Sequence, residues 1–154
     1  LTIAGGGPLE EQLKNFVRQN SLSGNVHFLG MLPQSELPAL YCRATMSVFP
    51  FIVAKSGDQE GLGLVVIEAM GCECPVIASS LPALRDTVEH GKSGILVAPE
   101  NPEALADAIL EALQNPEMLS KMAAHAREKV IEKFDWAKVA EKYAGLYSKH
   151  IRTN

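Results

Sequence analysis

Five short apolar runs recur along this chain, and segments with helical spacing of their apolar residues separate them. Parallel strands need long crossover connections, most often helices, so this alternation is typical of a parallel sheet covered by helices on both faces. The sequence therefore predicts an α/β fold with a Rossmann-like, doubly wound parallel sheet. Strands are predicted at residues 1–4, 26–30, 46–49, 75–78 and 95–98.

The helices are predicted from apolar spacing together with start and stop signals. Asn101-Pro102 and Asn115-Pro116 each combine an N-cap side chain with a proline at the first helical position. The predicted helices are residues 9–19, 35–43, 62–70, 84–89, 102–113, 116–133 and 135–150.

Composition narrows the class of protein. The 154 residues suffice for one domain with a real core, and their formal net charge of −4 argues against a nucleic-acid-binding surface. No apolar run approaches the length of a membrane span, and the chain opens without a signal peptide. Cys42, Cys72 and Cys74 predict no disulfide framework and are interpreted as small buried residues. We therefore expect a cytoplasmic location.

Residues 60–71, with the sequence EGLGLVVIEAMG, place two glutamates around a Gly-x-Gly turn. The β-branched residues at 65–67 could also form a strand. A predicted strand follows at once, however, and Gly71 suits a helix C-cap, so we predict a helix at 62–70 whose first turn is 61–64. Free backbone amides in such a turn, which the glycines leave open to close approach, suit a phosphate group.

The two glutamates of this stretch predict a ligand that carries hydroxyl groups as well as a phosphate. Glu68 lies in an apolar run, where a carboxylate is costly to bury without a partner. A diol, such as the two hydroxyls of a ribose, would supply the donors. Glu60, on the loop side, could accept from hydroxyls of a group attached to the phosphate. The alternative is that Glu68 is exposed on a surface helix and Glu60 is a solvated loop charge.

Two other features carry weaker signals. Gly5-Gly6-Gly7 follows the first strand, but Glu10 stands where a dinucleotide fingerprint needs its third glycine. We interpret these glycines first as a tight turn and second as part of a ligand site. His27 alternates outward between apolar neighbours and is interpreted as structural.

These residues resemble the C-terminal, donor-binding domain of the retaining glycosyltransferases of family 4 (group 1), which have the GT-B fold. The resemblance covers the whole chain, and its most specific piece is Glu60-Gly-Leu-Gly, four further residues, and Glu68-Ala. The supporting pieces are IAGGGP at residues 3–8, VHFLG at 26–30, PVIA at 75–78 and HGKSGILV at 90–97.

The resemblance implies a nucleoside-diphosphate sugar as donor, with retaining transfer of a hexose-type sugar. Glu60 would be catalytic and face hydroxyls of the donor sugar. The amides of Leu62 and Gly63 would lie by that sugar, and Glu68 would hold the ribose. The implied substrate-binding residues are Glu60, Gly61, Leu62, Gly63, Leu64, Val65, Glu68, Gly30 and Met31.

The resemblance also divides the remaining contacts. The amides of Leu64 and Val65 would lie by the diphosphate, and Gly30 and Met31 by the base. No cofactor or metal is expected, because positive side chains and the helix terminus meet the leaving diphosphate.

The chain departs from the family pattern in two ways. Residues 81–86, LPALRD, replace a common Gly-Gly-x-Pro-Glu stretch, with Asp86 at the place of the glutamate. Family members also have a strand and helix upstream of Leu1, with a basic pair that contacts the diphosphate, and an N-terminal acceptor-binding domain. We therefore expect a truncated piece, lacking its first strand and helix and inactive alone, with a vacant slot between strands 1–4 and 46–49.

Three functions follow from these observations. The leading hypothesis is the donor half of a glycosyltransferase whose partner is its own acceptor-binding domain, with any membrane association made through that domain. The second is a non-enzymatic sugar-nucleotide-binding or regulatory α/β module. The third is a related epimerase, which the spacing of Glu60 and Glu68 fits less well.

Overall fold

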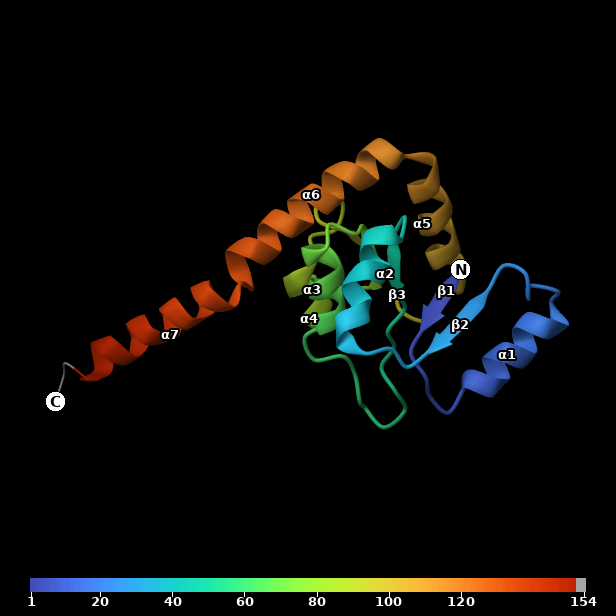
Figure 1. Ribbon diagram of the computed structural model, residues 1–154, viewed down its shortest axis with the longest axis horizontal. Coiled ribbons are helices and arrows are strands. Elements are labelled where there is room, and N and C mark those ends of the chain that lie inside the picture. Colours follow the sequence, from blue (N-terminus) through green and yellow to red (C-terminus); the bar gives the residue numbers. More distant parts are fainter. Residues whose placement is uncertain (152–154) are drawn as a thin grey trace. The chain divides into compact units, whose positions relative to one another are not determined.

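The computed structural model describes residues 1–151, which fold as two compact units (Figure 1). The first unit is Leu1–Ala39, and the second begins at Leu40. Each unit contains one parallel sheet, of order β1-β2 in the first and β3-β4-β5 in the second. The predicted parallel α/β architecture is therefore confirmed, with the sheet divided between the two units.

The first unit is a strand–helix–strand crossover. Its elements are β1 (Thr2–Ala4), α1 (Glu10–Gln19), β2 (His27–Gly30) and a 3-10 turn, η1 (Gln34–Glu36). The N–H of Gly5 donates to the carbonyl oxygen of Gly30 at 2.7 Å, which extends the pairing of β1 with β2. The Lys14 ammonium lies 6.0 Å from the centroid of the Phe28 ring, so α1 contacts β2 through a cation and an aromatic face.

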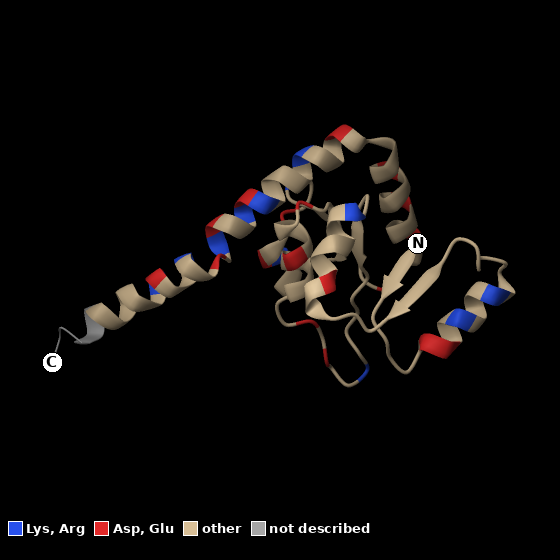
Figure 2. Cartoon of the chain, viewed as in Figure 1, with Lys and Arg blue, Asp and Glu red and all other residues tan. Residues whose placement is uncertain are grey.

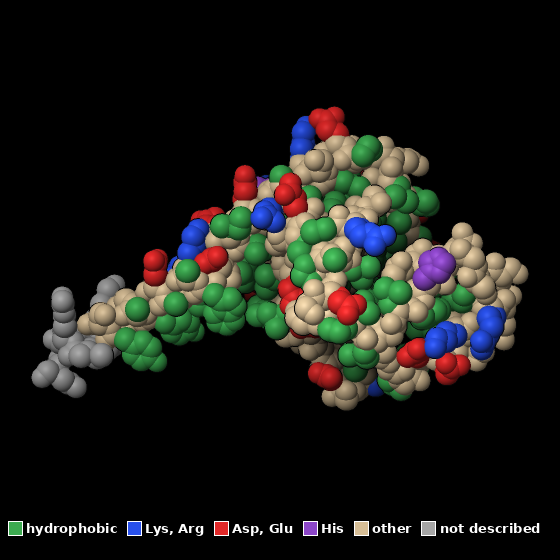
Figure 3. Space-filling model, in the orientation of Figure 1, with side chains coloured by type: hydrophobic (Ala, Val, Ile, Leu, Met, Phe, Trp, Pro, Cys, Tyr) green, Lys and Arg blue, Asp and Glu red, His purple; other side chains and the backbone are tan. Residues whose placement is uncertain are grey.

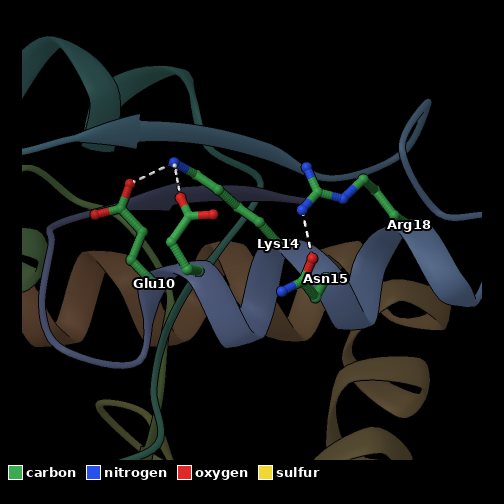
Figure 4. A network of polar contacts seen from close by, with 5 residues as sticks. Glu10, Lys14, Asn15 and Arg18 are labelled. Atoms are coloured by element: carbon green, nitrogen blue, oxygen red, sulfur yellow. Dashed lines mark hydrogen bonds and ion pairs between the residues drawn. The ribbon is translucent and has the colours of Figure 1, made fainter.

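A chain of polar contacts runs along α1 (Figure 4). Lys14 Nζ lies 2.7 Å from a carboxylate oxygen of Glu10 and 3.3 Å from one of Glu11. Arg18 donates to the side-chain oxygen of Asn15 one turn further on. The first turn of α1 is therefore acidic, and its two carboxylates share one lysine.

The second unit places three parallel strands beside the remaining helices. Its elements are α2 (Leu37–Arg43), which spans the unit boundary, β3 (Ser47–Phe49), α3 (Leu64–Gly71), β4 (Val76–Ser79), α4 (Pro82–Thr87), β5 (Ile95–Val97), α5 (Pro102–Gln114), α6 (Pro116–Lys133) and α7 (Trp136–Ile151). The central strand β4 is buried along its whole length, as expected for a strand with neighbours on both edges.

Two sets of contacts hold α3 in this unit. Val66 and Met70 are fully buried, and α3 packs against α6. Arg127 of α6 donates to the carbonyl oxygen of Gly71 at 2.5 Å, at the end of α3. Lys129, also on α6 and only 6% exposed, forms an ion pair of 2.9 Å with Glu89, next to the end of α4. The position of α3 is thus set by its apolar face and by α6.

Most predicted elements are confirmed, with shifts of a few residues at their ends. The side chains of Asn101 and Asn115 accept from the N–H groups of Ala104 and Met118, as predicted for N-caps. The predicted helix at 84–89 lies at Pro82–Thr87, because Pro82 takes the first helical turn and Val88 is already extended.

The predicted helix at 62–70 is wrong at both ends. α3 begins at Leu64, since Gly63 adopts the left-handed conformation, with φ 71° and ψ 49°. Gly71 lies inside the helix rather than at its cap. Cys72 is the C-cap, and Glu73 after it has a positive φ of 58°.

Candidate functional site

The turn that leads into α3 is fixed by close packing at Gly63. A Cβ added there would lie 2.5 Å from Cδ2 of Leu84 on α4, closer than atoms can approach. The N–H groups of Val66 and Ile67 donate to the carbonyl oxygen of Gly63, at 2.9 and 3.1 Å. A residue with a side chain would therefore disturb both the left-handed turn and the start of the helix.

Glu60 binds the backbone of its own loop. Its Oε1 atom accepts hydrogen bonds from the N–H groups of Gly61, Leu62 and Gly63, at 3.1, 3.3 and 2.9 Å. These bonds, above all that from Gly63, lower the pKa of the Glu60 carboxyl below its ordinary value. Successive amides that converge on one oxygen form an anion-binding concavity. Glu60 is thus a partly exposed loop acid that is held by the backbone amides of its own loop.

Glu68 lies on α3, partly shielded from solvent. It is half-buried, its Oε2 atom is buried, and its neighbours Ala69 and Met70 are fully buried. Tyr41 of α2 is buried close by. Burial first, and then the negative charge of Glu68, raise the pKa of the Tyr41 phenol to about 12. The fully exposed Glu68 of the alternative interpretation is therefore wrong.

The other predicted residues fall into two groups. Leu64 and Val65 are the first two residues of α3, and N–H groups at such positions have no carbonyl partner inside the helix. Gly61 and Leu62 are exposed in the loop, where acidic residues also lie (Figure 2). The structure therefore places seven predicted residues, all but Gly30 and Met31, on one loop and one helix of the second unit. These seven are Glu60, Gly61, Leu62, Gly63, Leu64, Val65 and Glu68.

Gly30 and Met31 belong to the first unit and are described there by themselves. Gly30 ends β2 with a φ of 65°, a conformation that favours glycine. Met31 follows it and is 78% exposed. An exposed apolar side chain after a strand is available for contact with a flat apolar group, and this part of the predicted site stays a prediction.

The cysteines differ from the prediction that all three are small buried residues. Cys42 is exposed, Cys72 is half-buried and Cys74 is buried. Burial first, and then the nearby Cys42 thiol, raise the pKa of the Cys72 thiol, although 30 positions separate the two cysteines. Nothing in the local sequence could reveal that Cys42 lies near Cys72, or Tyr41 near Glu68, because each pair joins residues far apart in the chain.

The fold and this loop define an α/β domain of the GT-B type, and the sequence comparisons name its family. The family of glycosyl transferases group 1 matches residues 1–129 of the chain. The chain therefore belongs to the group 1 glycosyltransferases, and it is a glycosyltransferase domain.

Relatives and solved structures agree with this assignment. The GDP-mannose-dependent alpha-(1-6)-phosphatidylinositol monomannoside mannosyltransferase of Mycobacterium tuberculosis is 34% identical over 94% of this chain and 38% of its own length. A sucrose-phosphate synthase from Thermosynechococcus elongatus superposes with a TM-score of 0.84, at 30% identity, over 100% of this chain and 39% of that one.

A third similar protein is HepE of Anabaena, whose crystal structure is in complex with UDP and glucose. It gives a TM-score of 0.82 at 25% identity, over 96% of this chain and 40% of that one. The chain thus spans well under half the length of these proteins. None of the helices in the described residues is both long and apolar enough to cross a membrane.

Proposed function

We propose that this chain is the donor-binding part of a retaining glycosyltransferase, which transfers a hexose-type sugar from a nucleoside diphosphate to an acceptor. The observation that carries the proposal is the pair of glutamates around the start of α3. Glu60, in the loop before the helix, is bound to three loop amides, and Glu68, about one turn into the helix, is half-buried. Relatives that depend on GDP-mannose or bind UDP and glucose support a nucleotide-sugar donor.

The diphosphate binds at the N-terminus of α3. The N–H groups of Leu64 and Val65 point out of the first turn, where the helix dipole favours negative charge. The first turn, residues 64–67, is wholly apolar, so it places no carboxylate against the phosphates. The amides of Gly61, Leu62 and Gly63 come just before the helix, where the sugar attached to the second phosphate would lie.

The two carboxylates then hold the two ends of the donor. Glu68 accepts from the two hydroxyls of the ribose, and each of these is a charge-assisted hydrogen bond. Glu60 faces hydroxyls of the sugar and acts in catalysis at that end. Gly30 and Met31 contact the base. The helix terminus and positive side chains stabilise the leaving diphosphate, so transfer needs no metal or other cofactor.

The acceptor is held by another domain of the same protein, which the lengths of the relatives support. The helix α7 offers a surface for such a domain, because apolar side chains gather along one side of it (Figure 3). Trp136, Tyr143, Leu146 and Tyr147 are between 55% and 86% exposed. Their spacing of three, four and seven places them on one stripe. We propose that this stripe faces the acceptor domain, and that the chain alone catalyses no transfer.

We propose a cytoplasmic location and a role in carbohydrate biosynthesis for the whole enzyme, with any membrane association made through the acceptor domain.

The substitution Glu68→Ala in the full-length protein tests the donor site. It removes two charge-assisted hydrogen bonds, each worth roughly 1.5–3 kcal/mol, so nucleotide affinity should fall at least about tenfold. Isothermal titration with UDP and with GDP measures the effect on the nucleotide that binds.

Glu128→Ala is the matched control, since Glu128 is an exposed glutamate on α6. It should bind as the parent does. A Glu68→Ala variant that is folded and binds the nucleotide as tightly as the parent would contradict the ribose assignment.

A further inference from the structure

The donor sugar and the Glu60 carboxylate are both directed to the same backbone amides. In the structure, the N–H groups of Leu62 and Gly63 donate to Glu60 Oε1 at 3.3 and 2.9 Å. Under the proposed function, the sugar lies beside these same two amides. Each N–H group has one proton to donate, so it cannot bond the carboxylate and a sugar oxygen fully at once.

We propose that Glu60 has two positions and exchanges between them when the sugar arrives. Without a sugar, its carboxylate binds the amides of Gly61, Leu62 and Gly63. With the sugar, the carboxylate turns to the sugar hydroxyls, and sugar oxygens accept from the amides of Leu62 and Gly63. This inference rests on the proposed function and adds a positioning role to Glu60, because the residue keeps the loop amides aligned until the donor takes them over.

The exchange keeps the Glu60 carboxylate and the amides of Leu62 and Gly63 paired at both stages, and the exposed amide of Gly61 passes to solvent. The amides pass from one oxygen acceptor to another, and the carboxylate passes from N–H donors to O–H donors. The free-energy cost of leaving these donors and acceptors without a hydrogen bond is therefore avoided in both positions of Glu60.

The loop is built with one fixed end and one open end. Gly63 is held by Leu84, against which even a single added carbon would clash. A Cβ added at Gly61, by contrast, would meet no described atom within 4 Å. The Gly63 amide thus stays in place while the Glu60 side of the loop has room to adjust. Such a pairing of a rigid and an open end suits a side chain that changes partner on an otherwise fixed helix start.

The exchange makes the loop respond to the sugar rather than to the nucleotide. The diphosphate is assigned to Leu64 and Val65, which lie beyond the amides that Glu60 holds. A nucleoside diphosphate alone would leave Glu60 on its loop, whereas the sugar-bearing donor would move it. The two ligands share their base, ribose and phosphates, so the position of Glu60 would distinguish the nucleotide sugar from the nucleoside diphosphate that remains after transfer.

Backbone amide resonances of the full-length protein provide the test, with UDP, GDP, UDP-glucose and GDP-mannose as probes. We expect the resonances of Leu64 and Val65 to shift with both the nucleotide and its sugar. Those of Gly61, Leu62 and Gly63 should shift strongly only with the sugar-bearing ligand.

The same resonances separate failure of the inference from failure of the proposed function. If the sugar-bearing donor shifts Leu64 and Val65 while Gly61–63 stay unchanged, or if the nucleotide alone moves all five, the exchange is wrong and the donor site stands. If no probe moves Leu64 and Val65, both the donor site and the exchange are overturned.

Glu60→Ala tests the resting position without any ligand. Hydrogen exchange of the Gly63 amide should accelerate by at least about tenfold, because its acceptor is gone. Asp58→Ala is the matched control, an exposed acid two positions away in the same loop. It removes the same charge and should leave the exchange rate of Gly63 within about twofold. Equal rates in the parent and Glu60→Ala would overturn the resting position.

Discussion

Two glycine-bearing turns lead into helices of this domain, and they differ in where their acids stand. The turn after β1 enters α1, whose first turn carries Glu10 and Glu11, with apolar Leu9 at the N-cap. The turn before α3 enters an apolar first turn, and its acid, Glu60, stands upstream and folds back onto the loop amides. Both turns resemble phosphate-binding turns in sequence, but their electrostatics differ.

The difference shows what makes a glycine turn suitable for an anion. Carboxylates in the first turn of a helix interact favourably with its dipole and occupy the positive end themselves. In α1 these carboxylates are also paired with Lys14, so little attraction for another anion remains. At α3 no acid lies in the first turn, and Glu60 upstream accepts from the amides of Gly61, Leu62 and Gly63 just before the helix. Glycines alone therefore do not mark a phosphate site. The position of the nearest acid decides whether the helix terminus is free to bind an anion.

The largest expected effect on stability comes from replacing one glycine by alanine, which adds a single methyl group, and the comparison is tested by doing so at each turn. Gly63→Ala must fit a Cβ 2.5 Å from Leu84 Cδ2 and hold a φ of 71°. Overpacking and left-handed strain together should lower the free energy of unfolding by roughly 2–4 kcal/mol. Urea unfolding of the full-length protein measures this loss.

Gly7→Ala is the counterpart at the other turn. An added Cβ at Gly7 would meet no described atom within 4 Å, so its unfolding midpoint should stay close to that of the parent. Losses of similar size at Gly7 and Gly63 would show that the two turns are equally constrained, and that the packing against Leu84 is not what fixes the second.

The sequence could predict the elements and the pair of glutamates because both depend on local patterns. Helical spacing and Asn-Pro starts gave α5 and α6 almost to the residue. α3 begins two residues later than predicted, after the left-handed Gly63, and the close packing of Gly63 against Leu84, 21 positions away, cannot be seen in the local sequence. The hold of Glu60 on its own amides was also missed, since residue types alone do not tell where a flexible carboxylate points.

A smaller effect should appear in the pH dependence of stability. Because the loop amides lower the pKa of Glu60 in the folded state, its carboxylate contributes stability above the ordinary glutamate value of 4.5, and this is lost as pH falls through the folded pKa. Glu60→Gln keeps an acceptor oxygen but removes the charge. The parent should therefore be more stable than Glu60→Gln at neutral pH, and the difference should shrink below pH 4.5.

Thermal unfolding of both proteins across this range measures the difference. Glu128→Gln, on the exposed side of α6, gives the baseline for neutralising a surface glutamate. A gap between the parent and Glu60→Gln that stays constant down to the lowest pH would mean that the charge of Glu60 does not stabilise the loop.

The smallest expected effect concerns metal ions, and it follows from the same contrast. Hard divalent cations bind clusters of carboxylate oxygens, and α1 rather than α3 gathers acids in its first turn. Under the proposed function, the helix terminus and positive side chains of the whole enzyme meet the charge of the leaving diphosphate, which is the role that a bridging cation has in other phosphoryl sites. We therefore expect EDTA to change the transfer rate of the full-length enzyme by less than about twofold.

A large loss of transfer rate in EDTA that Mg²⁺ or Mn²⁺ restores would contradict this expectation. Such a result would place a cation between the diphosphate and the acids of the loop before α3, and Glu60 would then be the first residue to substitute, because its carboxylate is the acid closest to the start of that helix.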